Sequence, residues 1–222
     1  MRVAALVAAR NEAGRVGDTV RAILAIPGVD EVVVADGSSA DGTAEEALAA
    51  GARVLVGPSR DGKGGALEAA LDRTEPADLY LLLDADLGAT AGEGVVLLEA
   101  VRSGEADLAV GVLPREPRHG GFRLVKRAAV EAIRRLSGFR AVEPLSGQRA
   151  VTSGCLAAVR PLARGFGVEV AMTVDAVRAG FHVIEVPVAM RHEPTGRDLA
   201  GFLHRGRQGL DLLRVTLPRA LG

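Results

Sequence analysis

LYLLLDADLG, residues 79–88, is the segment from which the rest of the chain can be interpreted. Its first five residues are apolar without polar alternation, which is typical of a central strand covered on both faces. The run stops at Asp84 and Asp86, whose side chains leave the same face if the backbone stays extended. Two carboxylates there indicate either a solvated turn with a helix cap, or a site where a hard divalent cation holds a phosphate.

Three earlier segments share this design of an apolar strand followed by polar residues. We expect strands at residues 3–8, 31–35 and 52–56, separated by segments with helical spacing, which predicts an α/β fold with a mostly parallel sheet between helices. Such sheets bind ligands beyond the carboxyl ends of their strands, so the polar clusters should converge on one crevice. The clusters after these three strands are Arg10-Asn11-Glu12, Asp36, and the glycine-rich turn at residues 61–65 that carries Lys63.

The second half continues the alternation less regularly. A loop is expected at residues 113–121 and a turn at 144–149, and Pro187 places the last strand at a sheet edge. There is no repeat and no linker, so we expect a single domain over residues 1–222. The other expected elements are strands at 107–112 and 182–188, and helices at 93–102, 122–136, 168–179 and from 198 onward.

Bulk composition excludes several classes of protein. A net charge of −1 gives no reason to expect nucleic acid as a partner, and the single cysteine, Cys155, excludes an internal disulfide and suggests a small buried side chain. No apolar run approaches the roughly 20 residues of a membrane-spanning helix, and the first apolar run ends too early for a signal peptide. We therefore expect a soluble, cytoplasmic protein, with contact to a membrane surface left open.

Four motifs in order, ARNE, ADGSSADGT, GKGGAL and DADLG, give the chain a family resemblance. It resembles the nucleotide-sugar-dependent glycosyltransferases of family 2, which have the GT-A fold. The second half is most similar to the glucosyl- and mannosyl-3-phosphoglycerate synthases, although the chain is shorter at both ends and Gln148 stands where they usually have an acid. Polyprenyl-phosphate sugar synthases resemble the first half equally well. The segments that carry the second resemblance are GGFR (120–123), PLSGQ (144–148), GFGVE (165–169), and Arg191-His192 ahead of Arg197.

The resemblance implies a nucleotide-sugar donor, which we expect to be a UDP sugar. Asp36 can accept the imide proton of uracil, and Lys63 suits a base carbonyl or a phosphate because glycines let the backbone approach an anion. Arg191 and Arg197 could neutralise the diphosphate as fork donors. The remaining residues expected around the donor are Ala9, Arg10, Asn11, Glu12, Gly37, Ser38, Asp84 and Ala85.

The expected cofactor is Mg²⁺ or Mn²⁺, held by Asp86 and, on the resemblance, by His192. Asp84 would then hold the ribose or the sugar hydroxyls. If the reaction inverts the anomeric carbon, Glu169 or Asp175 is the candidate base. If it retains configuration, as the synthases imply, Glu169 would bind sugar hydroxyls.

The acceptor half, residues 113–222, carries two basic features. The segment with Arg118, His119, Gly121, Arg123 and Lys126 suggests a phosphorylated or lipid-phosphate acceptor, or else solvated surface. The last helix could pack on the domain, form a homodimer or lie on a membrane. Two other functions remain open: a sugar-phosphate nucleotidyltransferase, against which the first loop, AARNEAGR, argues, and a catalytically silent nucleotide-sugar-binding domain.

Overall fold

The apolar run at residues 79–83 forms the middle of the sheet. In the computed structural model, β4 (Leu79–Asp84) lies between β1 (Val3–Ala9) and β6 (Arg149–Thr152), and Leu81 is fully buried. Helices cover both faces here, which is why the strand needs no polar alternation. The structure describes residues 1–57, 62–114, 120–192, 216 and 219.

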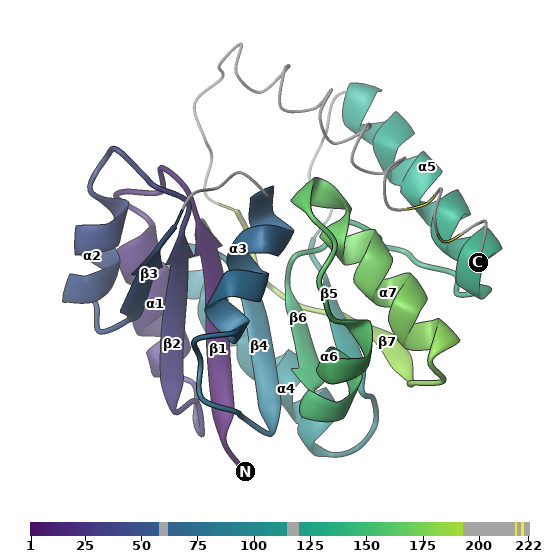
Figure 1. Cartoon of the computed structure of the whole chain (residues 1–222), viewed down its shortest axis with the longest axis horizontal. Coiled ribbons are helices and arrows are strands. Elements are labelled where there is room, and N and C mark those ends of the chain that lie inside the picture. Colours follow the sequence, from purple (N-terminus) through teal and green to yellow (C-terminus); the bar gives the residue numbers. More distant parts are fainter. Residues whose placement is uncertain (58–61, 115–119, 193–215, 217–218, 220–222) are drawn as a thin grey trace.

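Seven strands of the described residues make one sheet in the order β3-β2-β1-β4-β6-β5-β7 (Figure 1). All neighbouring strands pair in parallel except at β6, which runs antiparallel to both β4 and β5. The mostly parallel α/β sheet expected from the sequence is therefore confirmed. The remaining strands are β2 (Glu31–Asp36), β3 (Arg53–Val56), β5 (Leu108–Val112) and β7 (Val183–Pro187).

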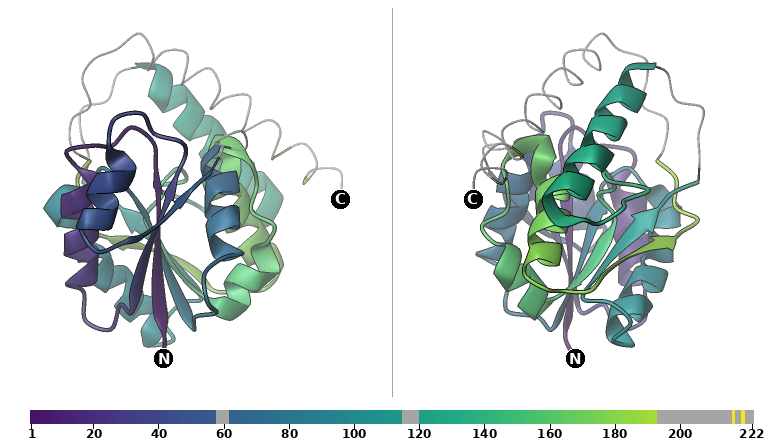
Figure 2. Two further views of the ribbon diagram at one scale, coloured as in Figure 1. Left: turned by 60° about the vertical axis from the view of Figure 1, so that its left-hand side comes forward. Right: turned by 90° about the vertical axis from the view of Figure 1, so that its right-hand side faces the viewer.

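Two layers of helices bury the faces of the sheet (Figure 2). One core cluster includes side chains of α1 (Val16–Leu24), α2 (Thr43–Ala49) and α4 (Gly94–Arg102). The opposite cluster includes side chains of α3 (Gly62–Leu71), α6 (Ser153–Val159) and α7 (Val168–Arg178). Outside this layer, α5 (Gly120–Ser137) packs on α7. The 3₁₀ helices are η2 (Gly88–Glu93) and η3 (Gly165–Gly167).

Strand β6 was not anticipated as a sheet element, and neither was helix α6 that follows it. Strand β6 has only four residues, which is too few to show a periodic pattern. Its pairing with β4 and β5 is what identifies it as a strand. The prediction that Pro187 marks an edge strand is confirmed, because among the strands that the structure describes β7 pairs only with β5. The helix expected from residue 198 lies outside the described residues, apart from residues 216 and 219.

The glycine-rich segment around Lys63 is helical, and the expected turn at residues 61–65 is therefore wrong from Gly62 onward. A Cβ on Gly64 would overlap the carbonyl oxygen of Ala163, and one on Gly62 would lie 2.8 Å from Cα of Gly165. These glycines therefore let the start of α3 press against the backbone at residues 163–165, rather than leaving a loop open to an anion.

No helix within the described residues is long and apolar enough to cross a membrane.

The sole cysteine should be chemically silent in the folded protein. Cys155 is fully buried in α6, and burial, with the charge of Asp107, raises the pKa of its thiol to about 12 from 9.0. Since the thiolate is the reactive form, we expect reaction with an aromatic disulfide reagent to slow by ~1,000-fold from the pKa alone. Thiol titration with and without denaturant measures this. Rapid labelling of the native protein would contradict the buried placement.

Candidate functional site

The carboxyl ends of three adjacent strands, β2, β1 and β4, bring the polar clusters of the first half together. The parallel register aligns Ala9 with Asp36, and Ala8 with Asp84. Strand ends that align in neighbouring parallel strands form one edge of the sheet, where ligands bind in such folds. The convergence expected from the sequence is present for these strands.

The segments after β1 and β2 are tied to each other through backbone and side-chain hydrogen bonds. The N–H of Gly37 donates to the carbonyl of Ala9 at 2.9 Å. The N–H of Asn11 donates to Oγ of Ser39 at 2.8 Å, and the N–H of Ala40 donates to Oδ1 of Asn11 at 3.1 Å. These bonds give the two candidate nucleotide-binding turns a common, fixed shape.

Asp36 combines burial with an existing local role. Its side chain is 2% exposed, and its carboxylate accepts hydrogen bonds from the N–H (3.1 Å) and the hydroxyl of Ser39. Asn11 and Ser38 both adopt a left-handed backbone, with φ of 57° each, which shapes the turns around it. A carboxylate has about four acceptor positions, so Asp36 keeps capacity for a further donor.

Lys63 stands at the centre of the site as a shared cation. Its Nζ lies 2.5 Å from Oδ1 of Asp84 and 2.9 Å from Oε1 of Glu169. Burial opposes the ammonium charge, but the two carboxylates outweigh it and raise the pKa of Lys63 above its usual value. A Cβ on Gly147 would overlap Nζ and approach the Asp84 carboxylate to 2.6 Å, so a larger residue there would displace these charged groups.

Gln148 holds Asp84 by two hydrogen bonds. Its Nε2 donates to Oδ2 of Asp84 at 2.6 Å, and its Oε1 accepts from the Asp84 N–H at 3.0 Å. Burial would raise the pKa of Asp84, but the charges of Lys63 and His192 and the hydrogen bonds from Lys63 and Gln148 hold it below its usual value. Both oxygens of Asp84 are therefore engaged by donors.

Arg149 connects the turn before β6 to helix α7. The guanidinium is buried, its Nε donates to the carbonyl of Ser146 at 2.9 Å, and its Nη1 donates to Oγ1 of Thr173 at 3.0 Å. Burial lowers the pKa of Arg149 to about 10, which leaves it charged at neutral pH. Since α7 carries Glu169 one turn before Thr173, these hydrogen bonds tie the turn that carries Gln148 to the helix that carries Glu169.

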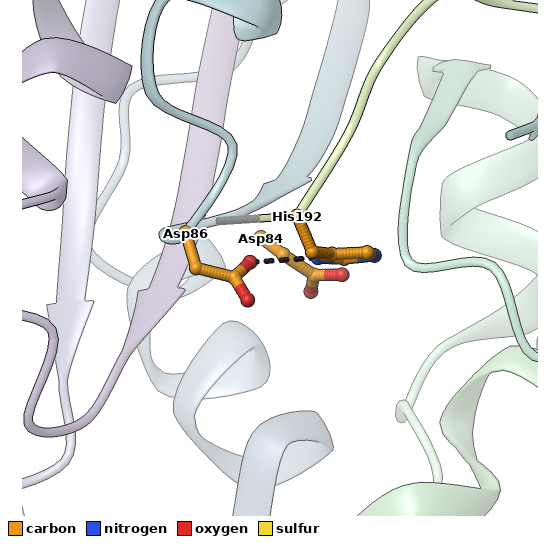
Figure 3. Close-up of side chains that lie close together, drawn as sticks. All are labelled: Asp84, Asp86 and His192. Carbon is orange, nitrogen blue, oxygen red and sulfur yellow. Dashed lines mark hydrogen bonds and ion pairs between the residues drawn. The ribbon is translucent and has the colours of Figure 1, made fainter. Parts of the chain in front are cut away.

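Asp84, Asp86 and His192 form a group that could hold a metal ion (Figure 3). One ligand atom from each lies within 4.8 Å of the others, and Nδ1 of His192 is 2.9 Å from Oδ1 of Asp86. Two ligands at right angles on an ion with bonds of about 2.1 Å lie about 3 Å apart, so this separation fits. The carboxylate oxygens suit Mg²⁺ and Mn²⁺ alike, and the imidazole beside them favours Mn²⁺ over Mg²⁺.

The turn that carries Asp86 is held from α1. Thr19 is fully buried; its hydroxyl donates to the carbonyl of Ala85 at 2.9 Å and accepts from the N–H of Gly88 at 2.8 Å. Asp84 ends β4 while Asp86 lies in the turn, so the extended backbone assumed from the sequence stops at Asp84. The turn nevertheless keeps both carboxylates at the same edge of the sheet (Figure 3).

Glu12 faces the same acidic group from the β1 side. Its Oε2 lies 2.6 Å from Nη2 of Arg15, although the contact is not aligned as a hydrogen bond. Burial raises the pKa of Glu12 to about 7, with further increases from Asp86, Asp84 and Asp41 against the lowering by Arg15. A neutral carboxyl at this position would be a hydrogen-bond donor.

Other expected residues lie apart from this cluster. Asp175, the alternative base, pairs with Arg219 through both carboxylate oxygens. Lys126 pairs with Glu143 at 2.5 Å, and the side chain of Arg191 is exposed. Arg118, His119 and Arg197 lie outside the described residues, and nothing is described of the side chain of Arg123.

Sequence reasoning missed the residues that support the charged ones. Thr19, Gly147 and Arg149 received no role, and Gln148 was noted only for its departure from an acid. Only tertiary contacts identify them. Thr19, Gly147 and Gln148 contact Asp84 or the turn after it, and Arg149 binds Ser146 and Thr173. No spacing along the chain predicts these contacts.

Comparison with known proteins yields consistent matches. The family model described as Glycosyl transferase family 2 matches residues 5–161. The chain is 34% identical over 179 residues to Glycosyltransferase AglJ of Haloferax volcanii, covering 77% of this chain and 57% of the relative. It is 31% identical over 219 residues to Glucosyl-3-phosphoglycerate synthase of Mycobacterium tuberculosis, covering 86% of this chain and 65% of the relative. The chain thus spans 57% and 65% of the length of these relatives.

Solved structures match over nearly the whole chain. The M. tuberculosis glucosyl-3-phosphoglycerate synthase in complex with Mn²⁺, UDP-glucose and glycerol 3-phosphate matches with a TM-score of 0.77 and 28% identity, covering 97% of this chain and 80% of that chain. The same enzyme with Mg²⁺ and UDP matches with a TM-score of 0.79 and 29% identity, covering 97% and 79%. These matches confirm the predicted GT-A fold.

Glu12 should make the folded protein less stable as the pH rises. Its pKa is about 7 in the fold against 4.5 for the free side chain, so the folded state holds more protons between these values. Stability falls with pH where the folded state binds more protons, and this displacement corresponds to roughly 3 kcal/mol. We expect urea unfolding from about pH 5 to about pH 8 to show a steeper loss for wild type than for Glu12→Gln. Equal slopes would contradict the raised pKa.

Proposed function

Because the chain belongs to glycosyl transferase family 2, we propose that it is a metal-dependent glycosyltransferase that transfers a sugar from a UDP sugar to a phosphorylated or otherwise anionic acceptor. The observation that carries the proposal is the joining of a metal-ligand group, Asp86 and His192, to the charged cluster of Asp84, Lys63 and Glu169 at the carboxyl edge of the sheet. A binding domain without activity would not need this second cluster.

In the proposal, residues 1–112 hold the donor. The two turns after β1 and β2, which hydrogen bonds join to each other, bind the nucleoside. Asp36 is buried and accepts the imide proton of uracil. The residues that line the base and ribose are Ala9, Arg10, Asn11, Glu12, Gly37 and Ser38. The shape of these turns is set by hydrogen bonds within the protein, so binding does not have to order them.

Asp86 and His192 are the proposed metal ligands. Asp84 is less suited to direct ligation, because Lys63 and Gln148 already engage its oxygens and the ammonium would repel a divalent ion. We assign Asp84 to the ribose or sugar hydroxyls. A bound Mn²⁺ or Mg²⁺ would supply positive charge for the diphosphate and for the leaving group. Arg191, which precedes His192, and Arg197 are proposed to add charge toward the diphosphate.

Lys63 and Glu169 are proposed to contact the sugar of the donor rather than its diphosphate. The ammonium offers a hydrogen-bond donor between two carboxylates, and it lies 2.9 Å from Oε1 of Glu169, so both side chains could meet an incoming sugar hydroxyl. In a retaining reaction Glu169 would orient the sugar. In an inverting reaction it would take the acceptor proton, and the anomeric configuration of the product separates these roles.

Residues 113–222 are proposed to hold the acceptor. Support comes from the relatives named glucosyl-3-phosphoglycerate synthase, one of which is crystallised with glycerol 3-phosphate. Gln148 differs from the acid expected there, and it contacts Asp84 rather than the acceptor side. The departure therefore does not argue against a small phosphorylated acceptor.

Metal should strengthen nucleotide binding through His192 and Asp86. Titration calorimetry of UDP with and without Mn²⁺ should show at least ~10-fold tighter binding with metal for wild type. His192→Ala and Asp86→Asn should lose most of this gain, because each removes one ligand atom. His182→Ala, a histidine whose ring contacts the carbonyl of Glu105 instead, is the matched control. Identical UDP affinity with and without metal in wild type would contradict the proposal.

Acceptor phosphate should be required for transfer. With UDP-glucose and Mn²⁺, we expect release of UDP in the presence of 3-phosphoglycerate to fall at least ~10-fold when glycerate replaces it, because charge-assisted hydrogen bonds to the phosphate are lost. Chromatography of UDP and of labelled product measures both arms. Transfer only to a polyprenyl phosphate in vesicles would replace the small acceptor with a lipid phosphate.

A further inference from the structure

Thr90 lies in η2, just after the turn that carries Asp86, and connects that turn to the segment that carries His192. Its Oγ1 lies 2.7 Å from the carbonyl of Leu87 and 3.2 Å from the carbonyl of Arg191, and it accepts from the N–H of Arg191 at 3.1 Å. Leu87 is the residue after Asp86, and Arg191 is the residue before His192. One hydroxyl thus joins the neighbours of both proposed metal ligands.

The hydroxyl's single proton sets the direction of these bonds. The shorter contact, to Leu87, is the better place for the proton, which leaves a lone pair for the N–H of Arg191. Thr90 is therefore a donor toward the Asp86 turn and an acceptor toward the His192 segment. A residue of the same shape without a hydroxyl would break both links together.

The His192 segment needs such a link because it has left the sheet. β7 ends at Pro187, and the last backbone hydrogen bond from this region to β5 in the described part of the chain is from the N–H of Val188 to Val112, at 3.1 Å. Met190 is fully buried and anchors the segment by its side chain. The Thr90 contact then fixes the backbone directly before His192.

We propose that Thr90 is a positioning residue for the metal site: it holds His192 next to Asp86, so that Nδ1 and Oδ1, 2.9 Å apart, can bind one Mn²⁺ or Mg²⁺ ion. The inference rests on the proposed metal-dependent function and adds a residue that touches neither the metal nor the donor. Residues that orient metal ligands typically change metal affinity by about 10- to 100-fold when removed.

Thr90→Val and Thr90→Ser test the role of the hydroxyl. Valine keeps the shape of threonine and loses the hydroxyl, whereas serine keeps it. We expect Mn²⁺ affinity in the presence of saturating UDP, measured by calorimetry and by the free-Mn²⁺ electron paramagnetic resonance signal, to fall about 10-fold or more in Thr90→Val. Affinity in Thr90→Ser should stay within about 3-fold of wild type. Thermal unfolding without metal shows that each variant folds, and Thr90→Ala replaces the valine variant if that one does not.

A double-mutant cycle asks whether Thr90 acts through His192. In the His192→Ala background, Thr90→Val should cause little further loss of Mn²⁺ affinity, since the ligand it positions is already absent. Unchanged Mn²⁺ affinity in Thr90→Val, an equal loss in Thr90→Ser, or a full additional loss in the His192→Ala background would each overturn the inference while the metal site stands. If wild type binds no Mn²⁺, the proposed function fails and the inference with it.

Discussion

A partly buried ammonium shared by two carboxylates is the interaction on which this site depends. Lys63 lies between Asp84 and Glu169, so the three side chains carry one positive and two negative charges in a largely buried space. Removing Lys63 would leave two carboxylates close together without their cation, which is far costlier than losing a surface pair. The surrounding chain must therefore place all three together.

Close backbone approach is how the chain does this. Gly62 and Gly64 let α3 press against residues 163–165, which lead into the helix that carries Glu169. Gly147 lets the turn before β6 lie against Lys63 and Asp84. Gln148 then supplies a neutral donor to the second oxygen of Asp84, where a further anion would have added to the negative excess.

Strand β6 links the two halves of the chain at this point. Because it runs antiparallel between β4 and β5, its amino end lies beside the carboxyl end of β4, and Gln148 arrives next to Asp84. A parallel strand would have presented its carboxyl end there instead. The antiparallel direction of β6 is thus the geometric reason that Gln148, 64 residues later in the chain, forms hydrogen bonds with Asp84 at the end of β4.

Local pattern was enough for the strands of the first half, the helix layers, the edge position of Pro187 and the convergence of the polar clusters, because apolar periodicity and parallel topology place strand ends at one edge. It did not reveal β6, the helical start at Gly62, or the partners of Lys63, since these depend on residues brought together across 21 to 106 positions. The chemical groups of the site are therefore readable from the order of residues along the chain. The support they receive from Gln148, Arg149, Thr19 and Thr90 is set by tertiary contacts, because a hydrogen bond between distant segments leaves no periodic trace in the sequence.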